Sequence, residues 1–450
     1  MSASNDATAE LAEWATGFGY ADAPAELLRA AGRGLIDTIG VILAGAPEET
    51  ALRAGLVARS QGGKPESSVL GTDLRTSASL AALVNGTAAH ALDYDDTQGN
   101  VHGHPSAVIV PAALAVAESV QATGKQLVEA FVVGTEVMGK AGRMLGSVPY
   151  QKGWHLTSVL GPLGAAAAAG KLLGLSTEQF RVALGIAVSQ ASGSRQNFGT
   201  MTKPFHIGWS AHGGVLAALL AANGYTANED MLTAPLGLTT LFDGDAERWS
   251  SARPGEPFEL VDPGLNMKVY PCCAGTHCAL DATFECREQL SETDLAAIEQ
   301  IDVNVHATGL VPLIYDYPAT GLQGKFCLRY VMSAALQDGQ ITVETFDDDR
   351  VRDGVYAGLM DRVKVFQDPT IEERFAEVIV HIPGREPVRS RVQEVKGSAT
   401  KPMTDDDLDK KFLACSQRVI SSGSAKEALV RLRAVEQIRT VSDLAALFVL

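Results

Sequence analysis

The chain has 450 residues, of which 46% are hydrophobic and 20% are charged, so it is long enough to bury a large core and to divide into two domains. Its formal net charge of -16 argues against nucleic acid or an anionic membrane surface as a partner, because both are bound mainly through excess lysine and arginine. If the ligand is an anion, the basic groups that bind it must be gathered locally.

The first thirty residues carry acidic side chains and lack a basic segment followed by an apolar one, so the sequence predicts no signal peptide and a cytoplasmic location. The longest strongly apolar stretch without charge, 156–170, is shorter than the roughly 18 to 20 residues that span a bilayer, and it contains Gly and Pro. We therefore expect no membrane segment.

A helical pattern runs from Ala9 to about Gly237, where Ala and Leu recur at spacings of three and four residues. We expect roughly eight to ten helices in this region. Gly and Ala are frequent inside them, and such small residues let helix axes approach closely. The sequence therefore predicts a compact buried bundle, which would also hold any dimer interface.

Apolar and polar residues alternate in a later part of the chain, which is typical of half-buried strands. The predicted strands are 301–308, 362–366, 376–382 and 388–395, with helical patterns at 293–300 and 324–337. We interpret 265–397 as a separate α+β domain with an antiparallel sheet.

Helical patterns return after Gly397, beginning at a Thr404 cap whose first turn holds three Asp residues. The first domain is therefore expected to be discontinuous, with residues 1–264 and 398–450 together. The predicted fold is mainly α: a large all-helical domain formed by both chain ends, with a smaller α+β lid domain, 265–397, inserted.

Six cysteines are present, and four of them lie between positions 272 and 286. In a reducing cytosol they are expected to be thiols. Neither a second CxxC nor closely spaced His ligands accompany them, which argues against structural zinc. We expect Cys272 and Cys273 to be packing residues of the smaller domain.

Four separated segments gather residues suited to acid–base chemistry, and together they hold seven of the nine histidines, counting His90 at the start of the first segment. For any one histidine alone, a packing role is the simpler interpretation, and we favour it for His206 and His212. The joint occurrence favours an active site. The residues are Asp93, Asp95, Asp96, Thr97, His102 and His104; Lys152 and His155; Lys203, His206 and His212; and Lys268, His277 and Asp281.

The aspartates and histidines of the first segment can chelate a divalent ion, but a metal would leave the other three segments unexplained. Lysine is a poor metal ligand and a good partner for substrate carboxylates. No GxGxxG follows a strand, no GxxxxGK[ST] is present, and no phosphate-binding loop for pyridoxal phosphate is evident. We expect neither a metal nor an organic cofactor. Asp95 and Asp96 fit a catalytic and a purely structural role equally well.

Five blocks of the sequence resemble the MmgE/PrpD family in order and spacing: HALDYDDT, HPSAVIVPAALAVAE, TKPFHIGWSAHGGVLAALLAANG, YPCCAGTHCALDA and KPMTDDDLDKKF. The resemblance covers the chain from about Ala9 to its C-terminus. Known members include 2-methylcitrate dehydratases, cis-aconitate decarboxylases and an iminodisuccinate epimerase. The resemblance implies an all-helical domain with an α+β lid, a homodimer with a site between the two domains, and no cofactor.

The resemblance also implies the positions of the active-site residues. We expect catalytic roles for Asp93, His104, His155, Lys203 and His277. We expect substrate-binding roles for Thr97, His102 and Lys268, with His102 able to share or replace the role of His104. The TKPFHIGWSAHGG block is closer to the decarboxylase and epimerase branches than to the methylcitrate dehydratases.

The predicted function is a cofactor-independent lyase, a dehydratase or decarboxylase of a small di- or tricarboxylic acid such as 2-methylcitrate or cis-aconitate. Lys203 and Lys268 would hold carboxylates, His104 and His277 would transfer protons, and Asp93 would orient one of the histidines. The alternative is an epimerase of an iminodisuccinate-like dicarboxylate. A third hypothesis is a binding or storage protein that has lost catalytic turnover. The Lys and His residues present at every expected active-site position argue against it.

Overall fold

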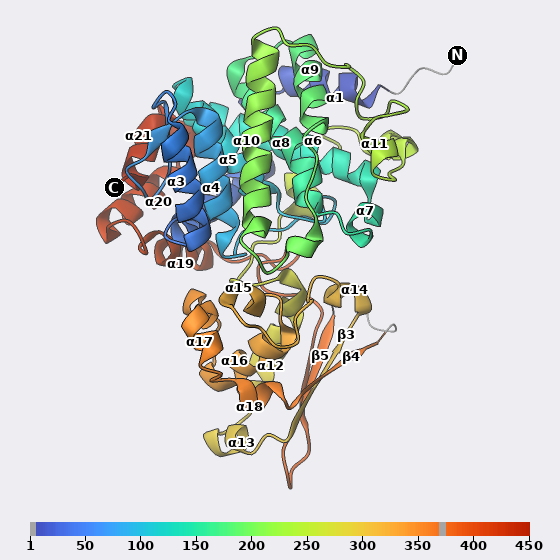
Figure 1. The fold of residues 1–450 in the computed structure, drawn as a ribbon, viewed down its shortest axis with the longest axis vertical. Coiled ribbons are helices and arrows are strands. Elements are labelled where there is room, and N and C mark those ends of the chain that lie inside the picture. Colours follow the sequence, from blue (N-terminus) through green and yellow to red (C-terminus); the bar gives the residue numbers. More distant parts are fainter. Residues whose placement is uncertain (1–5, 369–374) are drawn as a thin grey trace. The chain divides into compact units, whose positions relative to one another are not determined.

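The computed structural model describes residues 6–368 and 375–450, and the chain divides into two compact units. The first, here called the helical unit, comprises Met1–Gln196, Thr202–Met267 and Met403–Leu450. The second, here called the mixed unit, comprises Asn197–Met201 and Lys268–Pro402. The fold is mainly α, as the sequence predicts, and both ends of the chain contribute to the helical unit (Figure 1).

Five long helices form the centre of the helical unit. α8 packs against α5, α6 and α10, and α10 packs against α4. Almost every residue of α5 and α8 is buried, and a helix that is apolar all round belongs in the interior of a large domain. The five are α4 (Ala78–Ala91), α5 (Pro105–Ser119), α6 (Gly124–Leu145), α8 (Leu156–Leu173) and α10 (Thr202–Ala222).

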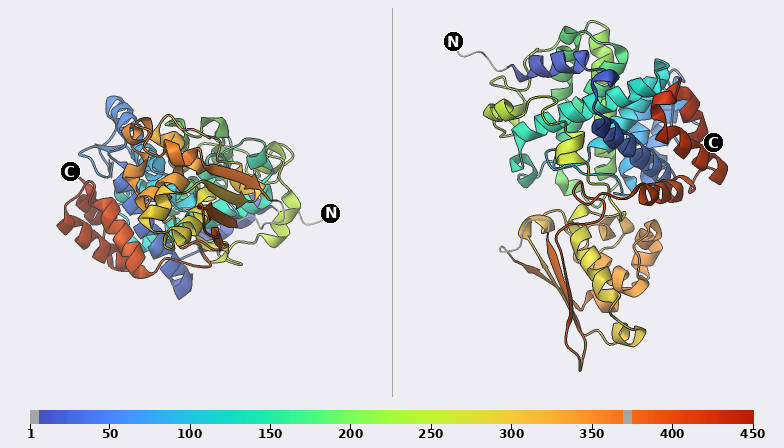
Figure 2. Two further views of the ribbon diagram at one scale, coloured as in Figure 1. Left: turned by 90° about the horizontal axis from the view of Figure 1, so that it is seen from below. Right: turned by 180° about the vertical axis from the view of Figure 1, so that it is seen from behind.

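Further helices surround this centre. At the C-terminus, α19 (Asp405–Ser416) packs against α2 (Ala25–Gly45), and α21 (Val441–Ala445) packs against α5, so the red C-terminal helices lie beside the N-terminal half of the chain (Figure 2). The predicted cap of α19 is confirmed, because the Thr404 side chain accepts a hydrogen bond from the backbone of Asp407. The remaining helices are α1 (Ala7–Gly17), α3 (Glu49–Gln61), α7 (Val148–Gln151), α9 (Thr177–Val188), α11 (Leu238–Leu241) and α20 (Ser422–Arg433).

Close approach of α4 and α10 depends on glycine. A Cβ atom on Gly208 would lie 2.2 Å from the carbonyl oxygen of Leu83, and one on Gly86 would lie 2.9 Å from the Cα of Gly208. Any side chain would therefore push the two helices apart. This confirms that small residues let the helix axes approach, and it brings the end of α4 beside the first turn of α10.

The apolar stretch 156–170 belongs to a longer helix. α8 contains Pro162 and continues through Lys171 to Leu173, so the helix has 18 residues although its uncharged part is shorter. In the described residues, α8 and α10 are long and apolar enough to cross a membrane, but both are mostly buried inside the protein. Such burial is typical of core helices in a globular domain. The prediction of no signal peptide concerns the first thirty residues, and residues 1–5 of these lie outside the described residues.

The mixed unit contains a four-stranded sheet in the order β4-β3-β5-β6, covered by α12 (His277–Arg287) and α16 (Leu328–Asp338). Alternate residues of β3 and β5 are buried, as the sequence pattern predicts. The strands are β3 (Gln300–Val305), β4 (Val363–Gln367), β5 (Ala376–His381) and β6 (Val388–Val392); the shorter helices are α13 (Glu292–Ala296), α14 (Ala307–Leu310), α15 (Gly321–Gly324), α17 (Asp348–Arg352) and α18 (Ala357–Met360).

The prediction of a purely antiparallel sheet was wrong for one pair of strands. β3 pairs in parallel with β4, with Ile301 opposite Val363, whereas the β3–β5 and β5–β6 pairs are antiparallel. A parallel pair needs a long crossover connection, and the helices α14 to α18 between β3 and β4 provide it. Alternation of apolar residues does not reveal strand direction, so the sequence pattern fits both arrangements.

Cys272 and Cys273 are packing residues of the mixed unit, as the sequence suggests. All six cysteines are thiols, and these two are buried among apolar residues. Burial raises the pKa of the Cys272 thiol to about 12. A protonated thiol is a weak nucleophile, so this side chain is suited to packing.

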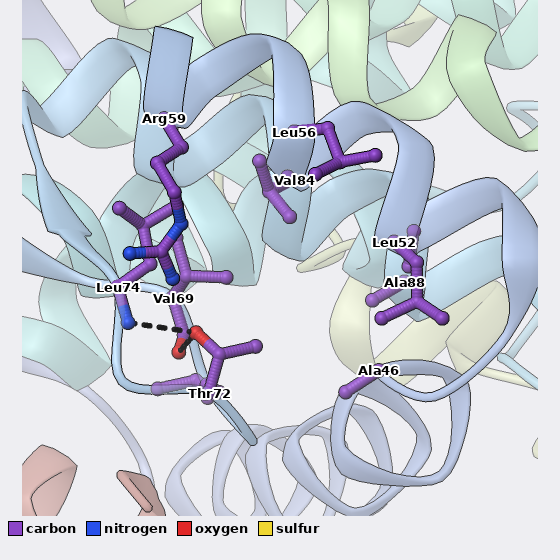
Figure 3. Close-up of a pocket in the computed structure, with 12 residues that line it drawn as sticks. Ala46, Leu52, Leu56, Arg59, Val69, Thr72, Leu74, Val84 and Ala88 are labelled. Carbon is purple, nitrogen blue, oxygen red and sulfur yellow. Dashed lines mark hydrogen bonds between the residues drawn. The ribbon is translucent and has the colours of Figure 1, made fainter. Parts of the chain in front are cut away.

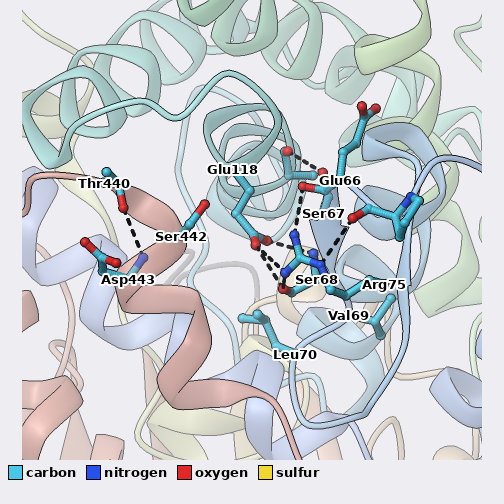
Figure 4. Close-up of polar contacts among 12 residues, drawn as sticks. Glu66, Ser67, Ser68, Val69, Leu70, Arg75, Glu118, Thr440, Ser442 and Asp443 are labelled. Carbon is cyan, nitrogen blue, oxygen red and sulfur yellow. Dashed lines mark hydrogen bonds and ion pairs between the residues drawn. The ribbon is translucent and has the colours of Figure 1, made fainter.

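A buried carboxylate ties a small hairpin to the centre of the helical unit (Figure 4). The hairpin is formed by β1 (Ser67–Ser68) and β2 (Arg75–Thr76). Glu118 of α5 is 2% exposed, accepts hydrogen bonds from the backbone N–H and hydroxyl of Ser68 at 2.7 and 2.9 Å, and lies 3.1 Å from the guanidinium of Arg75. At this depth, a carboxylate is stable only because each oxygen has partners.

Glu118→Ala is therefore expected to lower the free energy of unfolding by about 2–4 kcal/mol, since it leaves buried donors without an acceptor. Urea unfolding followed by circular dichroism measures the change. Glu427→Ala is the matched control, because Glu427 pairs with Arg431 on the exposed face of α20, where ion pairs contribute little. Equal effects of the two substitutions would contradict the structural role of Glu118.

Candidate functional site

A buried cluster of histidines and aspartates surrounds one lysine where several segments of the helical unit meet. His90 lies in the last turn of α4, and the loop that follows α4 carries Asp93 and Asp95. His104 immediately precedes α5, and Lys203 lies in the first turn of α10. Residues from two helices and the loop between α4 and α5 thus form a single buried polar group.

His90 lies at the centre of the cluster. Its Nδ1 atom is 2.9 Å from each carboxylate oxygen of Asp95, and its Nε2 atom is 2.5 Å from the Nζ atom of Lys203. Lysine has only donors, so Lys203 donates to Nε2, and the ring proton of His90 is then on Nδ1, directed at Asp95. The Lys203 ammonium also lies 3.3 Å from a carboxylate oxygen of Asp93.

His104 shares Asp95 with His90. The Nδ1 atom of His104 is 3.1 Å from Asp95 Oδ2 and 2.9 Å from the backbone oxygen of Asp96, and its ring centroid is 4.4 Å from that of His90. Both neighbours of Nδ1 are acceptors, so this nitrogen carries a proton. The Nε2 atom of His104, 3.9 Å from Asp93 Oδ1, is then the nitrogen able to exchange a proton with a ligand.

Two further histidines extend the cluster. The Nδ1 atoms of His155 and His206 lie 3.1 Å apart, so one of them donates to the other. The ring of His155 lies 6.2 Å from that of His90. His155 is the residue preceding α8, and His206 lies one turn after Lys203 in α10. The polar group therefore continues from Asp95 to His206.

Local packing fixes the loop that carries Asp93 and His104. A Cβ atom on Gly103 would lie 2.2 Å from the hydroxyl oxygen of Thr157 in α8, and this hydroxyl accepts the backbone N–H of His104 at 3.1 Å. Asp93 and His102 have positive φ angles of 52° and 47°, a region that side chains other than glycine rarely adopt. Such strain persists only where the surroundings hold the backbone, and it concentrates at functional sites.

The C-terminal helix α19 supports the same loop. The Nζ atom of Lys411 donates to the backbone oxygen of Tyr94 at 2.9 Å and pairs with the carboxylate of Asp37 at 2.7 Å. This ammonium also lies 4.0 Å from the centroid of the Tyr94 ring. A residue more than three hundred positions away in the sequence thus positions the backbone between Asp93 and Asp95.

A second buried network holds the middle of the loop. The carboxylate of Glu259 is fully buried and accepts hydrogen bonds from the side-chain amides of Gln98 and Asn100 at 2.9 and 2.8 Å. It also pairs with Arg143 at 2.6 Å and with Lys140 at 3.3 Å. The loop is therefore anchored at Tyr94 and again at 98–100, between Asp93 and His104, which preorganises its side chains.

Burial and neighbouring charges set the protonation of the central pair. Burial, together with the charges of Lys203 and His104 and against the opposing effect of Asp95, lowers the pKa of His90 to about 3. Burial acts to raise the pKa of Asp95, but charge interactions and hydrogen bonds with His90 and His104 hold it well below its ordinary value. His90 is therefore neutral and Asp95 ionised near pH 7.

The outer histidines are neutral as well. Burial, followed by the charge of Lys203, lowers the pKa of His155 well below its ordinary value and lowers the pKa of His206 to about 4. Burial raises the pKa of Asp96 to about 7, with Asp37 and Asp95 adding to the shift. His90, His155 and His206 are thus uncharged near pH 7, and the Lys203 ammonium lies between His90 and the carboxylate of Asp93.

The depressed pKa of His206 predicts a pH-dependent stability. Between about pH 6.5 and 4, the unfolded chain binds a proton at His206 that the folded chain does not, so stability falls as the pH is lowered through this window. In His206→Asn this contribution is absent. When the pH is lowered from 7 to 4.5, we expect the free energy of unfolding of the variant to fall by about 1–2 kcal/mol less than that of the original chain. Urea unfolding at each pH measures this difference, and parallel curves for both proteins would contradict it.

The structure places the predicted residues in two groups. Asp93, His104, His155 and Lys203 lie together in the cluster just described. Thr97 follows in the same loop, where its backbone N–H and oxygen pair with Asn266 at 2.9 and 2.8 Å, and the side chain of His102 is exposed.

The other two predicted residues belong to the mixed unit. Lys268 and His277 are both buried there, and the Nε2 atom of His277 lies 3.3 Å from the backbone oxygen of Cys272. The ring of Tyr270 packs edge-on against His277 at 5.2 Å, and the Tyr270 hydroxyl donates to Asp281 at 2.7 Å. Packing around His277 therefore fixes its ring orientation.

Sequence reasoning missed three members of the cluster. His90 was not assigned a role, His206 was interpreted as a packing residue, and Asp95 was left between a catalytic and a structural role. For His90, the available signal was its position five residues before Asp95, at the end of a predicted helix. Nothing in the sequence indicated that His206 contacts His155, because the two are separated by 51 positions.

Three long helices start at the cluster. α5 begins at Pro105, α8 at Leu156 and α10 at Thr202, next to His104, His155 and Lys203 respectively. The N-terminus of a helix carries a partial positive charge and unpaired N–H groups, so it favours anions. Together with the Lys203 ammonium, these helix ends make the surroundings suited to a carboxylate ligand, although the whole chain is acidic.

An apolar hollow elsewhere in the helical unit has a different character (Figure 3). It has a volume of about 140 Å³ and is lined mainly by aliphatic side chains of α3 and α4, such as Leu52, Leu56 and Val84. Arg59, its one charged lining residue, pairs with Asp73. This hollow therefore lacks the proton-transfer groups that the buried cluster provides.

Comparisons with known proteins identify the family. Residues 9–248 match the MmgE/PrpD N-terminal domain, and residues 270–437 match the MmgE/PrpD C-terminal domain. The chain is 29% identical to the cis-aconitate decarboxylase of Homo sapiens, over 92% of this chain and 89% of that protein. It is 28% identical to the enzyme of that name from Mus musculus, over 94% and 89% of the two chains. It is also 28% identical to a cis-aconitate decarboxylase-like protein of Aspergillus oryzae, over 98% and 96%. The chain therefore belongs to the MmgE/PrpD family.

Proposed function

We propose that this protein is a cofactor-independent lyase that decarboxylates a small tricarboxylic acid of the cis-aconitate type. The observation that carries the proposal is the Lys203 ammonium, buried between His90 and Asp93 at the starts of three helices. The names of the relatives support this substrate class over 2-methylcitrate. They also support decarboxylation over the dehydration that the family resemblance leaves open.

Decarboxylation breaks a carbon–carbon bond, releases CO2 and leaves the electron pair of that bond on the substrate. The negative charge then spreads towards a remaining carboxylate. An ammonium held next to this charge stabilises the transition state, typically by a few kcal/mol per well-placed group. In this proposal Lys203 has that role, because its own partners, His90 and Asp93, fix its position before substrate arrives.

The carbanion must then take up one proton. His104 is the proposed donor, because its Nδ1 atom is held by Asp95 and Asp96 while its Nε2 atom points to Asp93 Oδ1 at 3.9 Å. Asp95 and His90 act as positioning residues, since they hold the ring of His104 and the ammonium of Lys203. His155 remains a second candidate for proton transfer, and Thr97 and His102 remain proposed substrate contacts.

A proton NMR assay in D2O tests the reaction, with cis-aconitate, 2-methylcitrate and iminodisuccinate offered separately. Decarboxylation of cis-aconitate gives CO2 and one deuterium on carbon per turnover. Loss of water from 2-methylcitrate without CO2 would replace the decarboxylase with a dehydratase. Deuterium exchange without loss of either molecule would select the epimerase. Binding of cis-aconitate with no reaction of any compound would support a binding protein and overturn the proposal.

Lys268 and His277 keep their proposed roles in holding a carboxylate and transferring a proton. Lys268→Met and His277→Gln test them one at a time in the same assay. A rise in KM with unchanged kcat is expected for Lys268→Met, because a ground-state contact is lost. A lower kcat is expected for His277→Gln, and wild-type kinetics in both variants would remove these residues from the site.

A further inference from the structure

The buried cluster also contains the donor set of a transition-metal site. In the part of the chain that the structure describes, His90, Asp93, Asp95 and His104 form a group in which one donor atom of each lies within 4.8 Å of the others. Two imidazoles combined with carboxylates are ligands typical of Zn²⁺ and Co²⁺. The first three residues are buried, and the His104 side chain is only 11% exposed.

The Lys203 ammonium lies among these donors. Its Nζ atom contacts His90 Nε2 at 2.5 Å and lies 3.3 Å from Asp93 Oδ1, and His104 Nε2 is 3.9 Å from that same oxygen. A divalent ion at the position of Nζ would have a nitrogen of His90 and an oxygen of Asp93 as neighbours, with His104 next to them. The lysine thus supplies the cation that these lone pairs surround.

Asp95, the fourth member of this group, orients the two imidazoles. Its carboxylate contacts the Nδ1 atoms of both His90 and His104, at 2.9 and 3.1 Å. Metal-bound histidines commonly donate their second ring N–H to a carboxylate, which fixes the tautomer and directs the other nitrogen at the metal. Asp95 does this for two imidazoles at once, so both Nε2 atoms are prepared to bind.

We propose that this cluster is a latent site for a divalent transition metal, in which Zn²⁺ competes with the Lys203 ammonium for His90, Asp93 and His104 and thereby inhibits the enzyme. The metal has no part in the reaction proposed above. A chelator therefore relieves inhibition, whereas it would abolish activity if the metal were a resident cofactor.

Zinc binding to the full-length chain, measured by isothermal titration calorimetry after chelator treatment, tests the competition. Lys203→Ala removes the competing ammonium and leaves room for the ion. We expect it to bind one Zn²⁺ at least tenfold more tightly than the original chain, and Co²⁺ to give the intense visible absorption of a four-coordinate site. Adding His104→Gln to Lys203→Ala should weaken the binding at least tenfold.

Two results would overturn the proposal: equal zinc affinity with and without Lys203, or tight binding that survives loss of His104. If Lys203→Ala does not fold, the original chain and its single His104→Gln variant provide the comparison, with lower zinc affinity expected for the variant. Zinc that binds to cysteines or to other histidines contributes equally to both proteins in each comparison, so it does not change the difference in affinity. Binding is the measured quantity, so failure of the decarboxylase assay leaves this test intact.

Discussion

Lys203→Met is expected to lower kcat/KM by at least about 100-fold, because it removes the one ammonium buried at the centre of the cluster. Methionine keeps most of the side-chain volume, so the α4–α10 contact is retained. Steady-state kinetics on cis-aconitate measures the loss. Since Asp93 lies 3.3 Å from this ammonium, some loss of stability is expected as well, and a thermal melt shows whether the variant remains folded at the assay temperature.

Lys152→Met is the matched control for this prediction. Lys152 belongs to another of the four segments singled out from the sequence, but its side chain is 55% exposed and pairs with Asp243 at the surface. We expect wild-type kinetics for this variant. Lys203→Arg keeps the charge but not the compact shape, and partial activity is expected from it. A folded Lys203→Met protein with unchanged kcat/KM would refute the role assigned to Lys203.

Asp95→Asn is expected to lower kcat by about 100-fold or more with little change in KM. The carboxylate accepts from the Nδ1 atoms of His90 and His104, and an amide has one oxygen and two N–H groups, so it cannot accept from both rings in the same way. At least one histidine then changes tautomer or orientation. Loss of a carboxylate that fixes a catalytic imidazole commonly reduces turnover by several orders of magnitude.

The pH profile separates this positioning role from a merely structural one. Asp95 accepts a hydrogen bond from each ring, so the acidic limb of kcat against pH is expected to move in Asp95→Asn. Asp406→Asn is the control, because Asp406 lies on the exposed face of α19, where it pairs with Lys410. If Asp95→Asn lowers only the melting temperature and leaves the kinetic profile in place, Asp95 is a structural residue.

Sequence patterns predicted much of the fold because they report burial. The Ala- and Leu-rich periodicity of 9–237 corresponds to the central helices, and the alternating segments correspond to β3 and β5 of the sheet. Burial patterns carry no information on strand direction, so the parallel β3–β4 pair was missed. They also do not indicate whether a proline such as Pro162 ends a helix, since this depends on how neighbouring helices pack around it.

For single residues of the site as well, local sequence patterns do not reveal contacts between distant parts of the chain. Asp93, His104, His155 and Lys203 were predicted because acid–base residues gather in their segments and because the sequence resembles a known family. His90 and His206 were missed, since each takes its place through a contact with a residue far away in the sequence: His90 with Lys203, and His206 with His155. The support that Lys411 gives to Tyr94 was equally invisible, although the motif containing Lys411 had been recognised.

By itself, the sequence determined that this acidic chain folds mainly as buried helices and that its acid–base residues are concentrated in a few short segments. Both properties depend on composition and local spacing. Only the tertiary structure decided which of these groups share protons and charge, because the crossing at Gly86 and Gly208 brings His90 to Lys203, and burial then determines which groups are neutral. Contacts of this kind depend on distances in space, which spacing along the chain does not encode.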